Sequence, residues 1–177
     1  MTTQETTPPP QISRKRVITP TLLQMEAVEC GAAALAIVLA HHDKWVPLEE
    51  LRVACGVSRD GSKASNIVRA ARHYGMTANG HRKQPASVFD LVLPAIVFWE
   101  FNHFIVVEGY HKGVVYINDP AAGPRTLDWD EFDQGFTGVV MELTPSESFE
   151  PSGSPPGIVT GLWQRLQGSR RALGFAF

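Results

Sequence analysis

The most constraining feature of the sequence is an apolar run that begins at Cys30-Gly31 and ends at Ala40. It predicts a helix with a thiol on its first turn and the carboxamide of Gln24 six residues earlier. Unpaired backbone N–H groups and a positive partial charge at a helix start favour the thiolate form. The Gln24 amide, folded back beside Cys30, would join the Cys30 backbone N–H in holding an oxyanion. The alternative for this cysteine is a small, buried, inert side chain.

Composition narrows the class of protein. A chain of 177 residues suits one domain with a full core. Its net charge of −2 gives no basic field for nucleic acid, which excludes a nucleic-acid partner. The two cysteines, Cys30 and Cys55, are too few for a disulfide framework and lack the spacing of metal ligands, so we expect no metal and a reducing compartment. Cys55 reads as a packed small side chain.

The chain divides into four segments by composition. Residues 1–18 read as a flexible tail without a secretory signal, and residues 19–143 as one folded domain. Residues 144–157 are rich in Pro, Ser, Gly and Glu and read as a linker. Residues 158–177 read as the start of a basic amphipathic helix, either a detached surface helix or a juxtamembrane segment.

The folded part changes from helical to strand patterns near Pro94, which predicts the α+β class. After the Cys30 helix, we expect helices over 47–55, 62–73 and 85–93 and a short strand over 76–80. Strands are expected over 95–99, 103–110, 114–118, 125–127 and 138–143, with a short helix over 128–132.

A cysteine nucleophile needs a base, and His103 is the best of six histidines because it opens an apolar strand. The other five lie at helix ends or in polar loops and read as surface residues. A three-residue hairpin loop would place Asp119 directly opposite His103, with Cβ atoms about 5 Å apart. A two-residue loop would place the two side chains on opposite faces of the sheet, so the functional interpretation requires a loop of three or five residues. Asp119 would then fix the imidazole tautomer, although Asp before Pro is also a common turn.

Four motifs in this order resemble those of a known family. They are Gln24, Glu29-Cys30-Gly31, His103-Phe104 with the apolar residues after it, and Asn118-Asp119-Pro120. Together they resemble the papain-like cysteine peptidase domain at the N-terminus of bacteriocin-exporting ABC transporters, over residues 19–143. Residues 55–66 resemble the branch that serves lanthipeptides and peptides with long nitrile-hydratase-like leaders.

This resemblance implies helices packed on an antiparallel sheet, with the nucleophile at a helix N-terminus. It implies cleavage after a Gly-Gly, Gly-Ala or Gly-Ser motif at the end of a leader, coupled to export. Cys30 would be the nucleophile, His103 the base and acid, Asp119 its orienting partner and Gln24 the oxyanion donor.

The resemblance also sets the expected context. The peptidase domain would need no cofactor, since ATP and magnesium belong to transporter domains, and no GxxxxGK[ST] motif occurs here. We therefore expect an excised N-terminal domain, soluble as a fragment, whose residues 158–177 approach the first membrane helix. The intact transporter would hold it on the cytoplasmic side of the bacterial inner membrane.

Two other functions compete with leader removal. One is a non-catalytic leader-docking domain, which the presence of all four motif residues disfavours. The other is a papain-like hydrolase or acyltransferase for small amides, which the transporter-like linker and tail disfavour. For an amphipathic leader helix, the candidate contacts are Ile67, Ala71 and Tyr74, although their pattern favours core packing over a leader contact.

Overall fold

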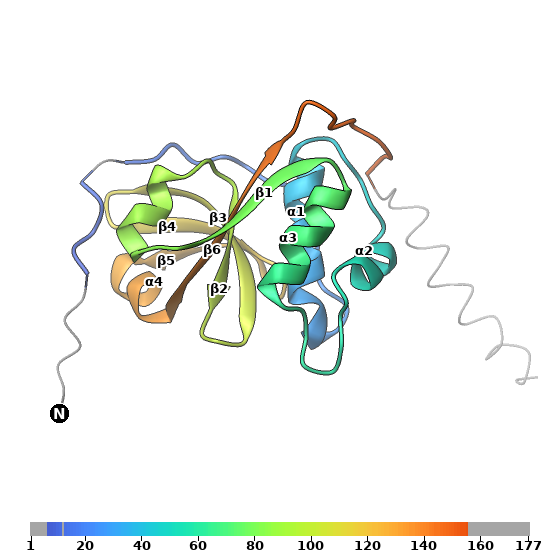
Figure 1. Ribbon diagram of the computed structural model, residues 1–177. Helices are drawn as coiled ribbons and strands as arrows, with labels where there is room; N and C mark the ends of the chain where they lie inside the picture. The colour runs from blue at the N-terminus through green and yellow to red at the C-terminus, as the bar shows by residue number, and fades with distance from the viewer. Residues whose placement is uncertain (1–6, 12, 156–177) are drawn as a thin grey trace, which may run out of the picture.

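The computed structural model describes residues 7–11 and 13–155, which form one six-stranded antiparallel sheet with helices packed against it (Figure 1). The strand order is β1-β6-β2-β3-β4-β5. The strands are β1 (Met76–Arg82), β2 (Ala95–Trp99), β3 (His103–His111), β4 (Val114–Asp119), β5 (Gly123–Asp128) and β6 (Phe136–Pro145). The helices are η1 (Ala27–Glu29), α1 (Cys30–His41), α2 (Leu48–Ala54), α3 (Ala64–His73), η2 (Pro85–Asp90) and α4 (Trp129–Gly135), of which η1 and η2 are 3-10 helices.

The expected α+β class is confirmed, and most elements lie where the sequence predicts them. Asp128 caps α4 as expected, because its carboxylate accepts a hydrogen bond from the Glu131 N–H at 2.8 Å. The helix expected over 85–93 is instead the 3-10 helix Pro85–Asp90. The strand expected over 125–127 is longer at both ends, because β5 pairs with β4 along its whole length.

The sheet is buried on both faces, which explains the continuous apolar run in β3. Phe104 and Val106 join the core cluster around α1, whereas Ile105 and Val107 join a second cluster with Phe132 of α4. Alternate residues of a strand point to opposite faces, so both faces need apolar side chains. Helix α1 is buried from Cys30 through Ala40 and packs against β3 of the sheet and against helices α2 and α3, while α3 also packs on β1.

The β3–β4 hairpin differs from the expected geometry. His111 pairs with Val114, so the loop has two residues, Lys112 and Gly113, with φ of 47° and 84°. Positive φ at both positions is the type I′ turn that suits the twist of a hairpin. The expected three-residue loop is therefore wrong.

The described residues of the N-terminal segment, 7–11 and 13–18, pack against the domain. Arg14 forms a β-bridge with Tyr110, and the indole N–H of Trp129 donates to the Thr7 carbonyl at 2.7 Å. The expected flexible tail over 1–18 is therefore not observed for its described residues.

The segment after β6, residues 146–155, also packs on the domain, and we call it the C-terminal strap. Trp45 N–H donates to the Ser152 carbonyl at 2.7 Å, and the Lys44 ammonium donates to the Glu150 carbonyl and lies over the Phe149 ring. Strand β6 itself extends to Pro145. The structure thus differs from the free linker expected over 144–157, while residues 158–177 lie outside the described part. In the described chain, no helix is long and apolar enough to cross a membrane.

Candidate active site

Cys30 is the first residue of α1, and its side chain is buried among the core residues. The neighbouring Gly31 allows this close packing. A Cβ at residue 31 would lie 2.8 Å from Ile67 Cδ1 and 3.3 Å from the Phe104 ring. The glycine therefore lets the start of α1 approach β3 directly beside His103.

His103 and Asp119 meet at the ends of two neighbouring strands. His103 is the first residue of β3 and Asp119 the last of β4, and His103 Nε2–H donates to Asp119 Oδ1 at 2.7 Å. Both side chains are mostly buried, with 19% and 6% exposed. The sequence-based pairing of the two residues is therefore confirmed in space.

A β-bulge at Glu108 makes this contact possible. From the turn to Gly109–Tyr116 the paired residue numbers sum to 225, but at Val107–Ile117 and Val106–Asn118 they sum to 224. Continuing the second register places Asp119 opposite Ile105, so Asp119 lies diagonal to His103 on the same face. The expectation that Asp119 lies directly opposite His103 is therefore wrong by two residues. The extra residue at the bulge shifts the register by one, which brings the two side chains to the same face as a loop with an odd number of residues would have done.

The surroundings of His103 favour its charged form. Burial of the ring opposes protonation, but hydrogen bonds to Asp119 and Cys30 and the negative charge of both partners raise the pKa of His103 to about 9. Since Nε2 is engaged by Asp119, the other ring nitrogen remains for the Cys30 thiol. An imidazolium held in this way favours a neighbouring thiolate.

Besides His103, two further groups hold Asp119 in the same site. Burial opposes its ionisation, yet the hydrogen bond from His103 and one from the Ala121 N–H at 2.8 Å lower its pKa, aided by the charge of Arg125. Arg125 Nε lies 3.2 Å from Asp119 Oδ2. The carboxylate is thus fixed in one orientation while one oxygen faces the imidazole.

Gln24 lies in the segment that leads into α1. Its backbone N–H donates to the Pro120 carbonyl at 2.8 Å, which ties it to the residue after Asp119. Its Oε1 is buried and has no hydrogen-bond partner among the described residues. The side chain is therefore not used to stabilise the described fold.

Sequence reasoning missed two buried carboxylates around this segment. Glu29 is fully buried and accepts hydrogen bonds from Met25 and Glu26, and Glu108 is fully buried and accepts two from Thr19. Glu29 stands in a quoted motif but received no role of its own. The available signal for Glu108 was a charged residue in an otherwise apolar strand.

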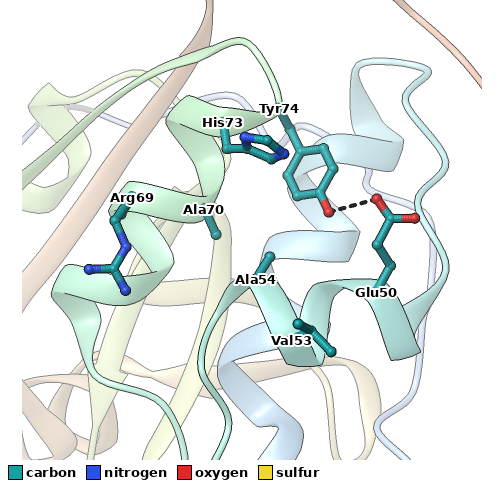
Figure 2. Close-up of a pocket in the computed structure, with 7 residues that line it drawn as sticks. All are labelled: Glu50, Val53, Ala54, Arg69, Ala70, His73 and Tyr74. Carbon is teal, nitrogen blue, oxygen red and sulfur yellow. Dashed lines mark hydrogen bonds between the residues drawn. The ribbon is translucent and has the colours of Figure 1, made fainter.

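The candidate leader contacts separate into two groups. Ile67 and Ala71 are fully buried in the core around α1 and do not reach the surface. Tyr74 lines a hollow of about 570 Å³ between α2 and α3, and its hydroxyl group donates a hydrogen bond to Glu50 at 2.8 Å (Figure 2).

The second cysteine, Cys55, is packed in the core, as the sequence predicts, and burial raises its pKa to about 12.

A thiol at the start of a buried helix, beside a His–Asp pair on an antiparallel sheet, defines the papain-like class of cysteine peptidases. The chain belongs to the peptidase C39 family, whose sequence profile matches residues 19–148.

Relatives of known function and structure agree with this membership. The chain is 32% identical over 136 residues to the probable microcin-H47 secretion/processing ATP-binding protein MchF of Escherichia coli, covering 77% of this chain and 19% of the relative. It is 30% identical over 159 residues to the colicin V secretion/processing ATP-binding protein CvaB of Escherichia coli, covering 89% of this chain and 23% of the relative. This chain thus spans about a fifth of the length of these two relatives.

A solved structure matches the described fold. The crystal structure of a double glycine motif protease from an AMS/PCAT transporter, in complex with the leader peptide, is 48% identical in sequence, with a TM-score of 0.73. The match covers 77% of this chain and 100% of that protein.

Proposed function

We propose that this chain is a cysteine endopeptidase that removes leaders from ribosomally made bacteriocin or lanthipeptide precursors. It cleaves after a Gly-Gly, Gly-Ala or Gly-Ser motif. In a longer protein it would work with membrane and ATP-binding domains in peptide export, on the cytoplasmic side of the bacterial inner membrane, and need no cofactor itself. The observation that carries the proposal is the 2.7 Å contact between His103 and Asp119, at a ring whose pKa is raised, against the effect of burial, by Asp119 and then by Cys30.

In the first step, the Cys30 thiolate attacks the carbonyl carbon of the scissile bond. The imidazolium of His103 gives its proton to the leaving amine as the C–N bond breaks, which leaves a thioester on Cys30. Asp119 holds the ring and stabilises its cationic form, so the thiolate and the acid are present together.

In the second step, His103 takes a proton from water, and the resulting hydroxide attacks the thioester. The C–S bond breaks, the leader departs as a carboxylic acid that releases its proton to solvent, and the thiolate and imidazolium are restored. In both steps negative charge develops on the carbonyl oxygen. The Cys30 backbone N–H and the Gln24 carboxamide are the donors we assign to it.

The hollow between α2 and α3 supports a place for an amphipathic leader helix. Its lining includes apolar Val53, Ala54 and Ala70 between the charged groups of Glu50 and Arg69 (Figure 2). Val53 is 82% exposed, which is unusual for a large aliphatic side chain on a helix that otherwise packs against the core. An apolar helix face would cover it.

A Val53→Asp variant tests this docking place. It should weaken leader binding while leaving the reaction of Cys30 with iodoacetamide unchanged. Val92→Asp is the matched control, because Val92 is also exposed but lies outside the hollow. Equal loss of leader affinity in both variants would place the leader elsewhere.

The main test uses Cys30→Ala with a precursor peptide that carries its leader. Mass spectrometry should show a single cut after the double-glycine-type motif in the parent and none in the variant, while both bind the leader with similar affinity. Cleavage by Cys30→Ala would contradict the proposal. A parent that binds but never cleaves would instead favour the leader-docking function, and turnover of small amides without leader cleavage would favour the third class.

A further inference from the structure

The segment from Gln24 to α1 is folded back onto one buried carboxylate. Met25 N–H donates to Glu29 Oε2 at 2.7 Å, and Glu26 N–H donates to the same oxygen at 2.9 Å. The Glu29 side chain is 1% exposed. A carboxylate that accepts two backbone N–H groups at such distances holds their loop in one conformation.

The charge of Glu29 does not explain its position. It precedes Cys30 directly, where a negative charge opposes formation of a thiolate. Arg52 of α2 compensates part of this charge, with its Nε 3.0 Å from Glu29 Oε1. A buried carboxylate that works against the thiolate, and needs a partner from another helix, must contribute through geometry instead.

The chain before Glu29 has two more anchors, one in the turn after β4 and one on β3. Gln24 N–H donates to the Pro120 carbonyl, next to Asp119. Thr19 N–H and Oγ1 donate to Glu108 Oε1 on β3 at 2.9 and 2.7 Å. Gln24 therefore lies between fixed points, and its backbone is held on one side by the turn after β4 and on the other by Glu29.

We infer that Glu29 is a positioning residue that keeps the loop at residues 24–26 folded, so that the Gln24 carboxamide is held at the start of α1. This inference rests on the proposed function, because it concerns the oxyanion donor of that reaction. Glu29 does not contact the substrate. It acts through Gln24, and its contribution disappears when the Gln24 amide is absent.

A double-mutant cycle tests the inference with a leader-bearing precursor. Glu29→Met removes the acceptor at similar volume and should lower kcat by about 10-fold or more, with KM within about 3-fold of the parent. In the Gln24→Ala background, the same change should lower kcat by less than about 3-fold. Glu29→Gln keeps an oxygen acceptor and should recover most of the lost rate.

Controls separate this inference from charge and from general damage. Glu26→Gln removes a carboxylate from the same turn, but that side chain is 60% exposed, and kcat should stay at the parent value. If Glu29→Met does not fold, Glu29→Asp, which shortens the side chain by one methylene, is placed in the same cycle. Iodoacetamide labelling of Cys30 should be at least as fast as in the parent in each folded variant, because removal of the Glu29 charge does not disfavour the thiolate.

Three results would overturn the inference: no loss of kcat in Glu29→Met, a full-sized loss that persists without the Gln24 amide, or equal losses in Glu29→Met and Glu29→Gln. The last result would assign the effect to charge. None of them bears on the proposed function, which stands or falls with Cys30-dependent cleavage by the parent enzyme.

Discussion

Gly31 and Phe104 lie in close contact, since a Cβ at residue 31 would lie 3.3 Å from the Phe104 ring, closer than an ordinary van der Waals contact. Phe104 follows His103 in β3, and Gly31 follows Cys30 in α1. The contact therefore sets how closely the nucleophile and its base approach each other.

Gly31→Ala should reduce activity more than stability. Overpacking against Ile67 and Phe104 costs about 1–3 kcal/mol, whereas alanine in a helix gains about 1 kcal/mol over glycine. We expect a net loss of at most about 2 kcal/mol in the free energy of unfolding, with kcat lowered by about 10- to 100-fold because α1 moves away from β3. Urea unfolding and steady-state kinetics measure the two effects.

Gly80→Ala is the control for this substitution, because a Cβ there would have no neighbour within 4 Å. Its kinetics should match those of the parent. Parent-like turnover in Gly31→Ala as well would show that the close approach at Phe104 is unimportant for the reaction.

The two thiols should differ in reactivity. Burial raises the pKa of Cys55 to about 12, whereas Cys30 lies at a helix N-terminus beside the His103 imidazolium. Iodoacetamide should therefore label Cys30 in preference to Cys55 in the folded protein, as mapped by peptide mass spectrometry across pH. Labelling of both thiols in urea is the control, and preferential labelling of Cys55 in the folded protein would contradict the ion-pair arrangement.

The alkaline limit of activity should report the protonation of His103. Its pKa of about 9 predicts that kcat/KM falls as pH rises through that value, since the leaving amine then lacks its acid. Asp119→Asn removes the negative charge and weakens the hydrogen bond that raise this pKa, so its alkaline limb should lie at lower pH. An unshifted limb in Asp119→Asn would assign the alkaline limit to another group.

The same pKa has a consequence for stability. Because the folded-state pKa of about 9 exceeds the ordinary value of 6.5, protonated His103 stabilises the fold fully below pH 6.5 and loses this effect as pH rises to 9. The difference in free energy of unfolding between the parent and His103→Ala should therefore shrink between pH 6 and pH 9.5. A difference that grows with pH would contradict the assigned direction.

Specificity at the cut should be steric. A double-glycine-type site presents little side chain to grip, so affinity must come from the remote leader while a narrow slot admits bare backbone. Replacing the penultimate glycine of the substrate with valine should lower kcat/KM sharply with little change in leader affinity. Detaching the leader should weaken cleavage of the same short sequence, and efficient leader-independent cleavage would contradict this account.

The sequence alone was sufficient for the elements and for the pairing of His103 with Asp119. Helix α1 and strand β2 show strong apolar patterns, and a histidine at the start of an apolar strand stands out. The sequence was insufficient for the register. The two-residue turn at Lys112-Gly113 and the bulge at Glu108 each shift the register of β3 against β4 by one residue from the expected pairing. Neither shift alters the apolar pattern along β3, so the sequence does not reveal them.

The terminal segments were misjudged for a related physical reason. Proline-rich and polar residues suggest flexible chain, yet Arg14 pairs with Tyr110 and Ser152 with Trp45 through backbone hydrogen bonds. Such contacts join residues far apart in sequence and need no local periodicity. These contacts therefore cannot be predicted from the composition of the terminal segments.

The C-terminal strap determines where a longer polypeptide would continue from this domain. It lies against Lys44 and Trp45, just beyond the last turn of α1, whereas Cys30 is at the first turn of the same helix (Figure 1). A helix of 12 residues is about 18 Å long. The last described residues therefore lie near the end of α1 that is remote from the nucleophile.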